Sequence, residues 1–264
     1  MNRTIPGVLA GCALLSVPAS ARPADPPHTI QVATDVLNDF AALPAHCIPA
    51  SLLAEARGVA IIPHVVKAGF LVGARGGHGL IATRDRNGAW SGVTFIDLGG
   101  ASFGLQAGVE STDVVLVFRT RDSLDRILRG RGKLTLGADA AIAAGPAGRE
   151  TEAATDARLR AEIFSYSRSR GLFAGVALDG AAIVYDHRAN ADYLNDHRPE
   201  TLQLTASLLT RLVQLSNPGA PRVPVTIQAP VFAPAPVMPP LAPIPAPPPA
   251  PVPYAPLQPV PPRN

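Results

Sequence analysis

Apolar residues recur every three to four positions near both ends of the central part of the chain, which is the spacing of an amphipathic helix. Residues 28–43 have this pattern, with Asp35 and Asp39 on the outward-facing side. A short second helix is expected around Pro49, where proline fits the first turn. Residues 199–215 form the last predicted helix. The apolar faces of the first and last helices would consist of Ile30, Val32 or Ala33, Val36, Leu37 and Phe40, and of Leu202, Thr205 or Ala206, Leu208, Leu209, Leu212 and Val213.

From Gly58 onward the apolar residues alternate with other residues instead, which is the pattern of β-strands. Glycines, or the Asp-x-Asn-Gly turn at residues 85–88, separate the strands, and a short helix over 121–130 interrupts them. Strands this closely spaced leave no room for crossover helices, so the sheet should be antiparallel. The predicted strands lie within residues 58–63, 68–76, 79–85, 92–99, 102–110, 113–120, 132–145, 161–170 and 171–185.

Glycines recur four residues apart within these strands. They form the sets Gly69, Gly73 and Gly77; Gly100, Gly104 and Gly108; and Gly171 and Gly175. Residues four apart in a strand lie on one face, so such rows allow sharp curvature or the close approach of another layer. The predicted fold class is therefore α+β: a mainly antiparallel, strongly curved, barrel-like or sandwich-like sheet with helices at its N- and C-terminal ends.

The N-terminal residues differ from the folded domain, which we expect to span 28–216. Residues 1–21 contain Arg3, a short apolar run and a small-residue ending, the features of a secretory signal peptide cleaved after Ala21. The segment also contains a lipobox-like Leu-Ala-Gly-Cys sequence, so a lipid anchor at Cys12 is the alternative. Either processing route predicts an exported protein of the periplasm or cell envelope.

The C-terminal residues 217–264 form a second segment of distinct composition, with 19 of the 29 prolines of the chain. Proline removes backbone donors and fixes φ, which predicts an extended, disordered tail. Such a tail serves as a spacer or as a docking strand for a protein partner. Cys47 is the only cysteine besides Cys12, so it has no internal disulfide partner once residues 1–21 are removed; a buried apolar role or an intermolecular pair remains.

Several short motifs point to chemistry, but each lacks the context that the chemistry needs. The stretch 100–104 matches G-x-S-x-G around Ser102, yet a strand, not the required helix, is predicted after it. His187 and His197, in two Asp-His-Arg repeats, are ten residues apart and do not share a helix face, and His64 and His78 have no acidic neighbour in sequence. We therefore predict no catalytic residue, no metal site and no cofactor. A net charge of +3 among few charged residues favours no nucleic-acid partner.

Two basic features remain as candidate binding sites. The first surrounds the helix over 121–130, where Asp122 and Asp125 balance part of the positive charge; its members are Arg126, Arg129, Arg131 and Lys133. The second is the alternating stretch 165–170, which on a strand places Tyr166, Arg168 and Arg170 on one face and three serines on the other. Such arginines can hold phosphate oxygens, while the alternative is an ordinary polar outer face.

Four blocks of the chain together resemble the SYLF domain family. They are GVAIIPHVVKAGFLVGARGGHGL, WSGVTFIDLGGASFGLQAGVESTDVVLVF, KLTLGADAAIAAGPAGR and SYSRSRGLFAGVALDG, in this order between Leu52 and Leu194. The resemblance implies a non-enzymatic domain that binds phospholipid, with phosphoinositides as ligands of the eukaryotic members. The helix over 28–43 has no lysine or arginine, so phosphoinositide selectivity does not carry over, and an exported protein would not meet actin.

The combined prediction is a bacterial, envelope-associated module that binds anionic phospholipid. The two basic features would contact the headgroups, with Leu172 and Phe173 contacting the apolar part of the membrane. The alternative is an envelope scaffold whose proline-rich tail recruits a protein partner.

Overall fold

The computed structural model describes the folded part of the chain, all of which belongs to one unit, Met1–Pro230. The predicted signal peptide and the tail from residue 220 onward lie outside the described residues, as do four predicted site residues: Arg131, Arg170, Leu172 and Phe173. The described residues are 25–42, 47–129, 132–145, 161–169, 178 and 180–219, with side chains excluded at 69–72, 102–109 and 169.

Two very long strands make up most of the sheet. β1 (Gly58–Arg84) has 27 residues and β2 (Trp90–Phe118) has 29, so the six short strands predicted for this region are wrong. Glycine keeps both backbone hydrogen-bonding groups, so it weakens a strand without interrupting the ladder. The predicted turn between them is confirmed: the Asp85 carboxylate accepts from the N–H groups of Asn87 and Ala89 at 2.8 and 2.9 Å, and Gly88 has a φ of 83°.

Four short strands extend the ladder formed by the hairpin. β5 (Ile163–Ser169) pairs with the second half of β2, and β6 (Ala182–Tyr185) pairs with its first half, both antiparallel. β3 (Lys133–Thr135) adds to β6, and β4 (Ile142–Ala144) adds to β5 in parallel. The described strands thus form one six-stranded, mainly antiparallel sheet, as the sequence predicted.

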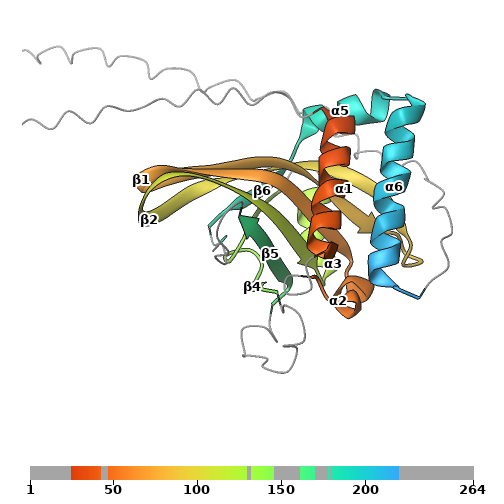
Figure 1. Cartoon of the computed structure of the whole chain (residues 1–264), viewed down its shortest axis with the longest axis horizontal. Helices are drawn as coiled ribbons and strands as arrows, with labels where there is room; N and C mark the ends of the chain where they lie inside the picture. Colours follow the sequence, from red (N-terminus) through yellow and green to blue (C-terminus); the bar gives the residue numbers. More distant parts are fainter. Residues whose placement is uncertain are drawn as a thin grey trace, which may run out of the picture. The chain divides into compact units, whose positions relative to one another are not determined.

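The sheet curls because the hairpin turns back on itself. Figure 1 shows β1 and β2 running out to a common tip and returning. Away from this tip, the beginning and the end of β1 lie side by side: Arg84 N–H donates to the Arg57 carbonyl at 3.1 Å, and a Cβ on Gly79 would lie only 2.3 Å from the Ile61 carbonyl oxygen. The predicted strong curvature is therefore confirmed. Two glycine pairs face each other across the turning part of the ladder: Gly69 opposite Gly108, and Gly76 opposite Gly99.

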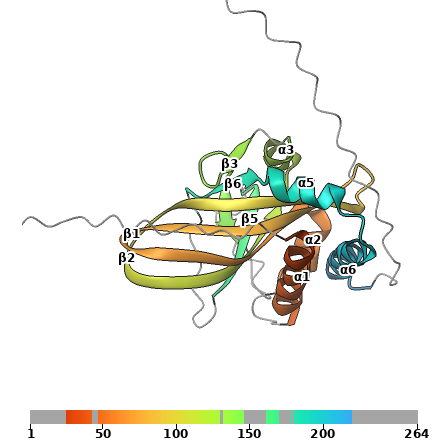
Figure 2. The same ribbon diagram turned by 90° about the horizontal axis from the view of Figure 1, so that it is seen from above.

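Helices cover both faces of this sheet, and a separate apolar core fills each side. One core joins the sheet to α1 (Pro26–Ala42), α2 (Ala50–Glu55), α5 (His187–Asn195) and α6 (Pro199–Ser216). The other joins it to α3 (Arg121–Leu128). Figure 2 shows α3 on the opposite side of the sheet from α1 and α6.

The predicted helices are confirmed, with one correction to their apolar faces. Leu202 was expected in the stripe of the last helix but is 45% exposed, and Thr201 is buried instead. Of the predicted alternatives Thr205 and Ala206, Thr205 is the buried one. The face of α1 is as predicted, with Ile30, Ala33, Val36, Leu37 and Phe40 buried. None of the helices in the described part of the chain has both the length and the apolar character needed to span a bilayer.

Candidate functional site

The first basic feature lies on the outer surface of α3 and the neighbouring strand β3. Burial of Leu124 and Ile127 in the core beneath α3 turns Arg126 and Arg129 toward solvent, with side chains 56% and 80% exposed. Lys133, at the start of β3, is also exposed. Arg126, Arg129 and Lys133 define what we call the α3–β3 surface.

Both arginines of this surface form long ion pairs with nearby carboxylates. Arg126 Nη1 lies 3.7 Å from Asp139 Oδ1, and Arg129 Nη2 lies 3.8 Å from Asp125 Oδ2. Hydrogen bonds from Thr135 and, secondarily, the charges of Arg126 and Lys133 lower the pKa of Asp139. Exposed pairs at such distances contribute about 0–1 kcal/mol. Since these contacts are weak, both guanidinium groups can exchange them for an external anion.

The second basic feature is not an outer face, which corrects the predicted role of Tyr166. Its side chain is only 6% exposed and belongs to the core beneath α1. Its ring lies against the backbone of Gly145, where an added Cβ would come within 2.1 Å of the ring carbon Cζ. A side chain so enclosed cannot reach a headgroup in this conformation.

Arg168 lies on the same side of β5 as Tyr166, as the alternation predicted, and it reaches α1. Its Nη1 lies 2.6 Å from Asp39 Oδ2, and its side chain is 30% exposed. The contact is an ion pair by distance, although Nη1 is not aligned for a hydrogen bond. Asp39, expected to face solvent freely, thus binds α1 to the sheet.

The two basic features therefore lie on opposite faces of the sheet. The side chains beneath α3 belong to one core, and Tyr166 belongs to the other, together with residues of α1 and α6. Figure 2 shows the same separation of α3 from α1. The expectation that a strand face and a nearby basic helix make one headgroup surface is wrong, because the sheet and its two cores stand between them.

A cluster of one histidine and two carboxylates was not predicted from the sequence. His78 Nδ1 lies 2.5 Å from Asp97 Oδ1 across the hairpin, and the Asp186 carboxylate joins them, with one donor atom from each group within 4.8 Å of the others. The hairpin turn alone would not have revealed this pair: counting outward from it places position 78 opposite position 96, and a register shift between Thr83 and Arg84 moves the pairing to position 97.

This cluster has the donor types of a divalent-cation site, but its groups already have structural partners. Asp186 Oδ1 accepts from the N–H groups of Arg188 and Ala189 at 3.0 and 2.9 Å and so caps the start of α5. The Asp97 carboxylate is in contact with His78. The positive end of a helix also disfavours a cation beside the capping carboxylate. The cluster is explained by its part in the fold.

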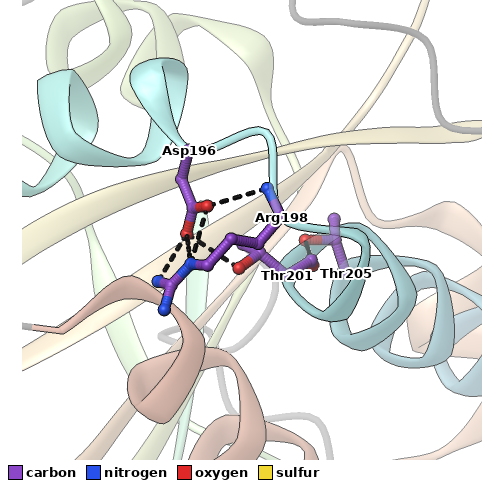
Figure 3. Close-up of polar contacts among 4 residues, drawn as sticks. All are labelled: Asp196, Arg198, Thr201 and Thr205. Atoms are coloured by element: carbon purple, nitrogen blue, oxygen red, sulfur yellow. Dashed lines mark hydrogen bonds and ion pairs between the residues drawn. The ribbon is translucent and has the colours of Figure 1, made fainter.

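The second Asp-His-Arg repeat connects α5 to α6 (Figure 3). Asp196 Oδ2 accepts from Arg198 Nη2 at 2.7 Å and from the Thr201 hydroxyl at 2.8 Å. Hydrogen bonds from the Arg198 side chain, then from its backbone and from Thr201, hold the pKa of Asp196 well below its usual range. Thr205 donates to the Thr201 carbonyl at 2.9 Å, which leaves its oxygen to accept from the Tyr193 hydroxyl at 3.2 Å.

Both repeats are thus helix ends, as predicted, since Asp186 and Asp196 flank α5 and the two histidines after them are exposed. Ser102 lies within β2, which continues to Phe118. The strand-to-helix turn of a nucleophile elbow does not occur there.

Comparison with known proteins gives one family match. Residues 99–211 match the Ysc84 family, described as "Las17-binding protein actin regulator". The matched range begins in the first half of β2 and ends in α6, so it includes α3, β5 and the α5–α6 connection. The resemblance to the SYLF blocks in the sequence is thereby confirmed. No solved structure gives a significant match.

Curated relatives match a longer part of the chain. "SH3 domain-containing YSC84-like protein 1" of Homo sapiens is 37% identical over 166 residues, which are 61% of this chain and 48% of the relative. "LAS seventeen-binding protein 3" of Saccharomyces cerevisiae (strain ATCC 204508 / S288c) is 41% identical over 152 residues, 57% of this chain and 33% of the relative. The chain therefore spans half or less of the length of these relatives. The name of the yeast relative describes binding to another protein.

Proposed function

We propose that this chain, whose residues 99–211 match the Ysc84 family, carries a SYLF-type domain and is a non-enzymatic module that binds anionic phospholipid surfaces through the α3–β3 surface. The observation that carries the proposal is the exposure of Arg126, Arg129 and Lys133 on the face of the sheet opposite α1 and α6. Arg168 is not included because it is paired with Asp39. The headgroup and membrane roles of Arg131, Arg170, Leu172 and Phe173 stay predictions outside the described residues.

The expected binding is weak and reversible. A lysine or arginine near an anionic membrane surface contributes about 1 kcal/mol, and salt screens the attraction within a Debye length of about 8–10 Å. Three such residues would contribute at most about 3 kcal/mol, or roughly 100-fold in affinity. The nearby carboxylates of Asp122, Asp125 and Asp139 reduce this attraction further. Because the remaining attraction is small and electrostatic, screening at high salt should abolish binding.

Co-sedimentation of the full chain with vesicles tests the proposal. We expect binding to vesicles of equal parts phosphatidylcholine and phosphatidylglycerol at low salt, and none to phosphatidylcholine alone. Replacing Arg126, Arg129 and Lys133 together by glutamine should lower the affinity about 10- to 100-fold.

The matched control removes the same charge elsewhere. Arg57, Arg86 and Arg188 are exposed and lie outside the α3–β3 surface, so their triple replacement by glutamine should retain most of the binding. Equal loss of binding in both triple variants would mean that only net charge matters, and unchanged binding in the first variant would remove the α3–β3 surface from the site.

A second candidate function is recruitment of a protein partner by the proline-rich tail. It is favoured by the family description and the name of the yeast relative, which describe binding to another protein. Deletion of residues 220–264 separates the two functions. Vesicle binding should survive the deletion if the α3–β3 surface is the binding site, and should be lost if the tail is responsible.

We also propose that the chain is exported and acts at a bacterial cell envelope, on the evidence of residues 1–21 alone. Mass spectrometry of the mature protein from the native host tests this. A chain that begins at Arg22 indicates cleavage after Ala21, a chain that begins at a lipidated Cys12 indicates the lipoprotein route, and an intact Met1 would contradict export.

A further inference from the structure

The helices α1 and α6 lie side by side on one face of the sheet (Figures 1 and 2). Residues of both helices line two hollows that share Arg211 and Gln214. The first has a volume of about 350 Å³ and is lined mostly by residues with polar side chains, among them Thr34, Asn38, Ser207 and Thr210. The second has a volume of about 480 Å³ and is apolar, with walls that include Phe40, Ile48, Leu53 and Leu215. Both volumes lie within the range of about 300–1,000 Å³ that is typical of small-ligand sites.

Arg211 and Gln214 of α6 line both hollows and so stand at the junction between them. Arg211 Nη1 donates to Gln214 Oε1 at 3.4 Å, and its Nε is buried without a hydrogen-bond partner. Among the described residues, no carboxylate lies within ion-pair distance of Arg211. A buried donor without an acceptor is unfavourable, so an external anion at this position would be stabilising.

We propose that these two hollows together bind a single-chain anionic amphiphile, with its alkyl chain in the apolar hollow and its carboxylate or phosphate at Arg211. The order of the two hollows matches such a ligand. The alkyl chain would fill the apolar hollow, the charged group would lie at Arg211 where the two hollows meet, and any further polar part would extend into the first hollow. This site takes one dissolved molecule and lies on the opposite face from the α3–β3 surface, so it does not depend on the membrane binding proposed above.

Cys47 supplies a readout of the site that is separate from membrane binding. It is a free, half-buried cysteine in the wall of the apolar hollow. An alkyl chain in that hollow should slow alkylation of its thiol by iodoacetamide, followed at the Cys47 peptide by mass spectrometry. The probe is dodecanoate, added to the full chain below the concentration at which it forms micelles.

Head-group dependence tests the assignment of Arg211. Dodecan-1-ol has the same chain and no charge, so it should need about tenfold more ligand to give the same protection, the effect of one charge-assisted hydrogen bond. A lysophosphatidic acid with a dodecanoyl chain distinguishes phosphate from carboxylate recognition, since the stronger ligand identifies the head group. Equal protection by dodecanoate and dodecan-1-ol would overturn the role of Arg211.

Two variants and one control complete the experiment. Arg211→Gln should weaken dodecanoate about tenfold and leave dodecan-1-ol unchanged, whereas Arg188→Gln, an exposed arginine of α5, should change neither. Ala41→Phe places a ring in the apolar hollow and should abolish protection by both ligands. Melting temperatures verify that the variants are folded.

All of these variants should still co-sediment with anionic vesicles, so failure of this site and failure of the α3–β3 surface are distinguishable. Protection of Cys47 by neither ligand, or protection that persists unchanged in Ala41→Phe, would overturn the proposal.

Discussion

Replacing Gly79 with alanine should destabilise the curled sheet, because the two ends of β1 meet at this residue. The added Cβ would lie 2.3 Å from the carbonyl oxygen of Ile61 and 2.8 Å from the Cα of Ile62. Both atoms are backbone atoms of a strand held in the ladder with β2, so neither can move aside as a side chain could. The two segments of β1 must therefore separate.

The expected loss of stability can be estimated from the clash between the new Cβ and backbone atoms. Overpacking a well-packed core costs about 1–3 kcal/mol, and a clash with backbone belongs at the upper end. For a domain of 150–250 residues, each kcal/mol lowers the Tm by about 2–4 °C. We therefore expect Gly79→Ala to lose about 3 kcal/mol of unfolding free energy in urea and about 6–12 °C in Tm.

Gly99 is the matched control, since it also lies in the hairpin and a Cβ there would meet nothing within 4 Å. Gly99→Ala removes unfolded-state entropy without a clash, so its stability should change by no more than about 1 kcal/mol, toward greater stability. Equal melting temperatures for the two variants would refute the contact between the ends of β1 on which the curled architecture depends.

Three further predictions concern contacts that hold the helices. Asp196→Asn should lower the Tm at neutral pH. Because hydrogen bonds from Arg198 and Thr201 hold the pKa of Asp196 below its usual range in the folded state, the stabilisation is present above about pH 4 and is lost as the pH falls, so the difference from wild type should shrink in acid. A difference that is constant with pH would contradict this. Asn190→Ala removes the hydrogen bonds that the Asn190 side chain makes with the N–H and C=O groups of Phe95, at 2.9 and 2.8 Å. The free energy of unfolding in urea should fall by about 2–3 kcal/mol; a loss below about 0.5 kcal/mol would show that other groups or water satisfy the Phe95 backbone in the variant. Arg168→Gln and Asp39→Asn should show a coupling of about 0.5–1 kcal/mol in a double-mutant cycle, with vesicle binding unchanged; reduced binding in Arg168→Gln would return that residue to the lipid site.

The sequence predicted those parts of the fold that depend on local periodicity. Helix α1 and the turn at residues 85–88 were predictable because a 3.6-residue apolar repeat and an Asp-x-Asn-Gly turn have few alternative structures. The strand lengths were not predictable. Gly73 and Gly104 do not end their strands, because the β1–β2 ladder continues on both sides of each glycine. The rows of glycine did predict curvature, but the meeting of Gly79 with Ile61 requires knowledge of how far the hairpin turns.

The candidate site was predictable by residue type but not by position. Whether Arg126 and Arg168 share a surface depends on which side of the sheet the chain crosses after β2, and no local pattern specifies that side. The partner of His78 was not predictable by counting either: the hairpin turn pairs position 78 with position 96, and only the register shift between Thr83 and Arg84 brings His78 opposite Asp97.

A pattern in the strands explains why the exposed cations lie outside the central sheet. Residues 59–62 and 114–118 are unbroken apolar runs that are buried at every position, in contrast to the alternation of a sheet with one wet face. Such runs require a covered sheet on both sides, and the two cores supply that cover. A charged residue on an adjacent strand then lies beneath a helix and must find a partner there, as Arg168 does with Asp39. The cations that remain available to a membrane lie outside this covered centre: Arg126 and Arg129 project from the outer side of the covering helix α3, and Lys133 begins β3, the last strand at one edge of the sheet.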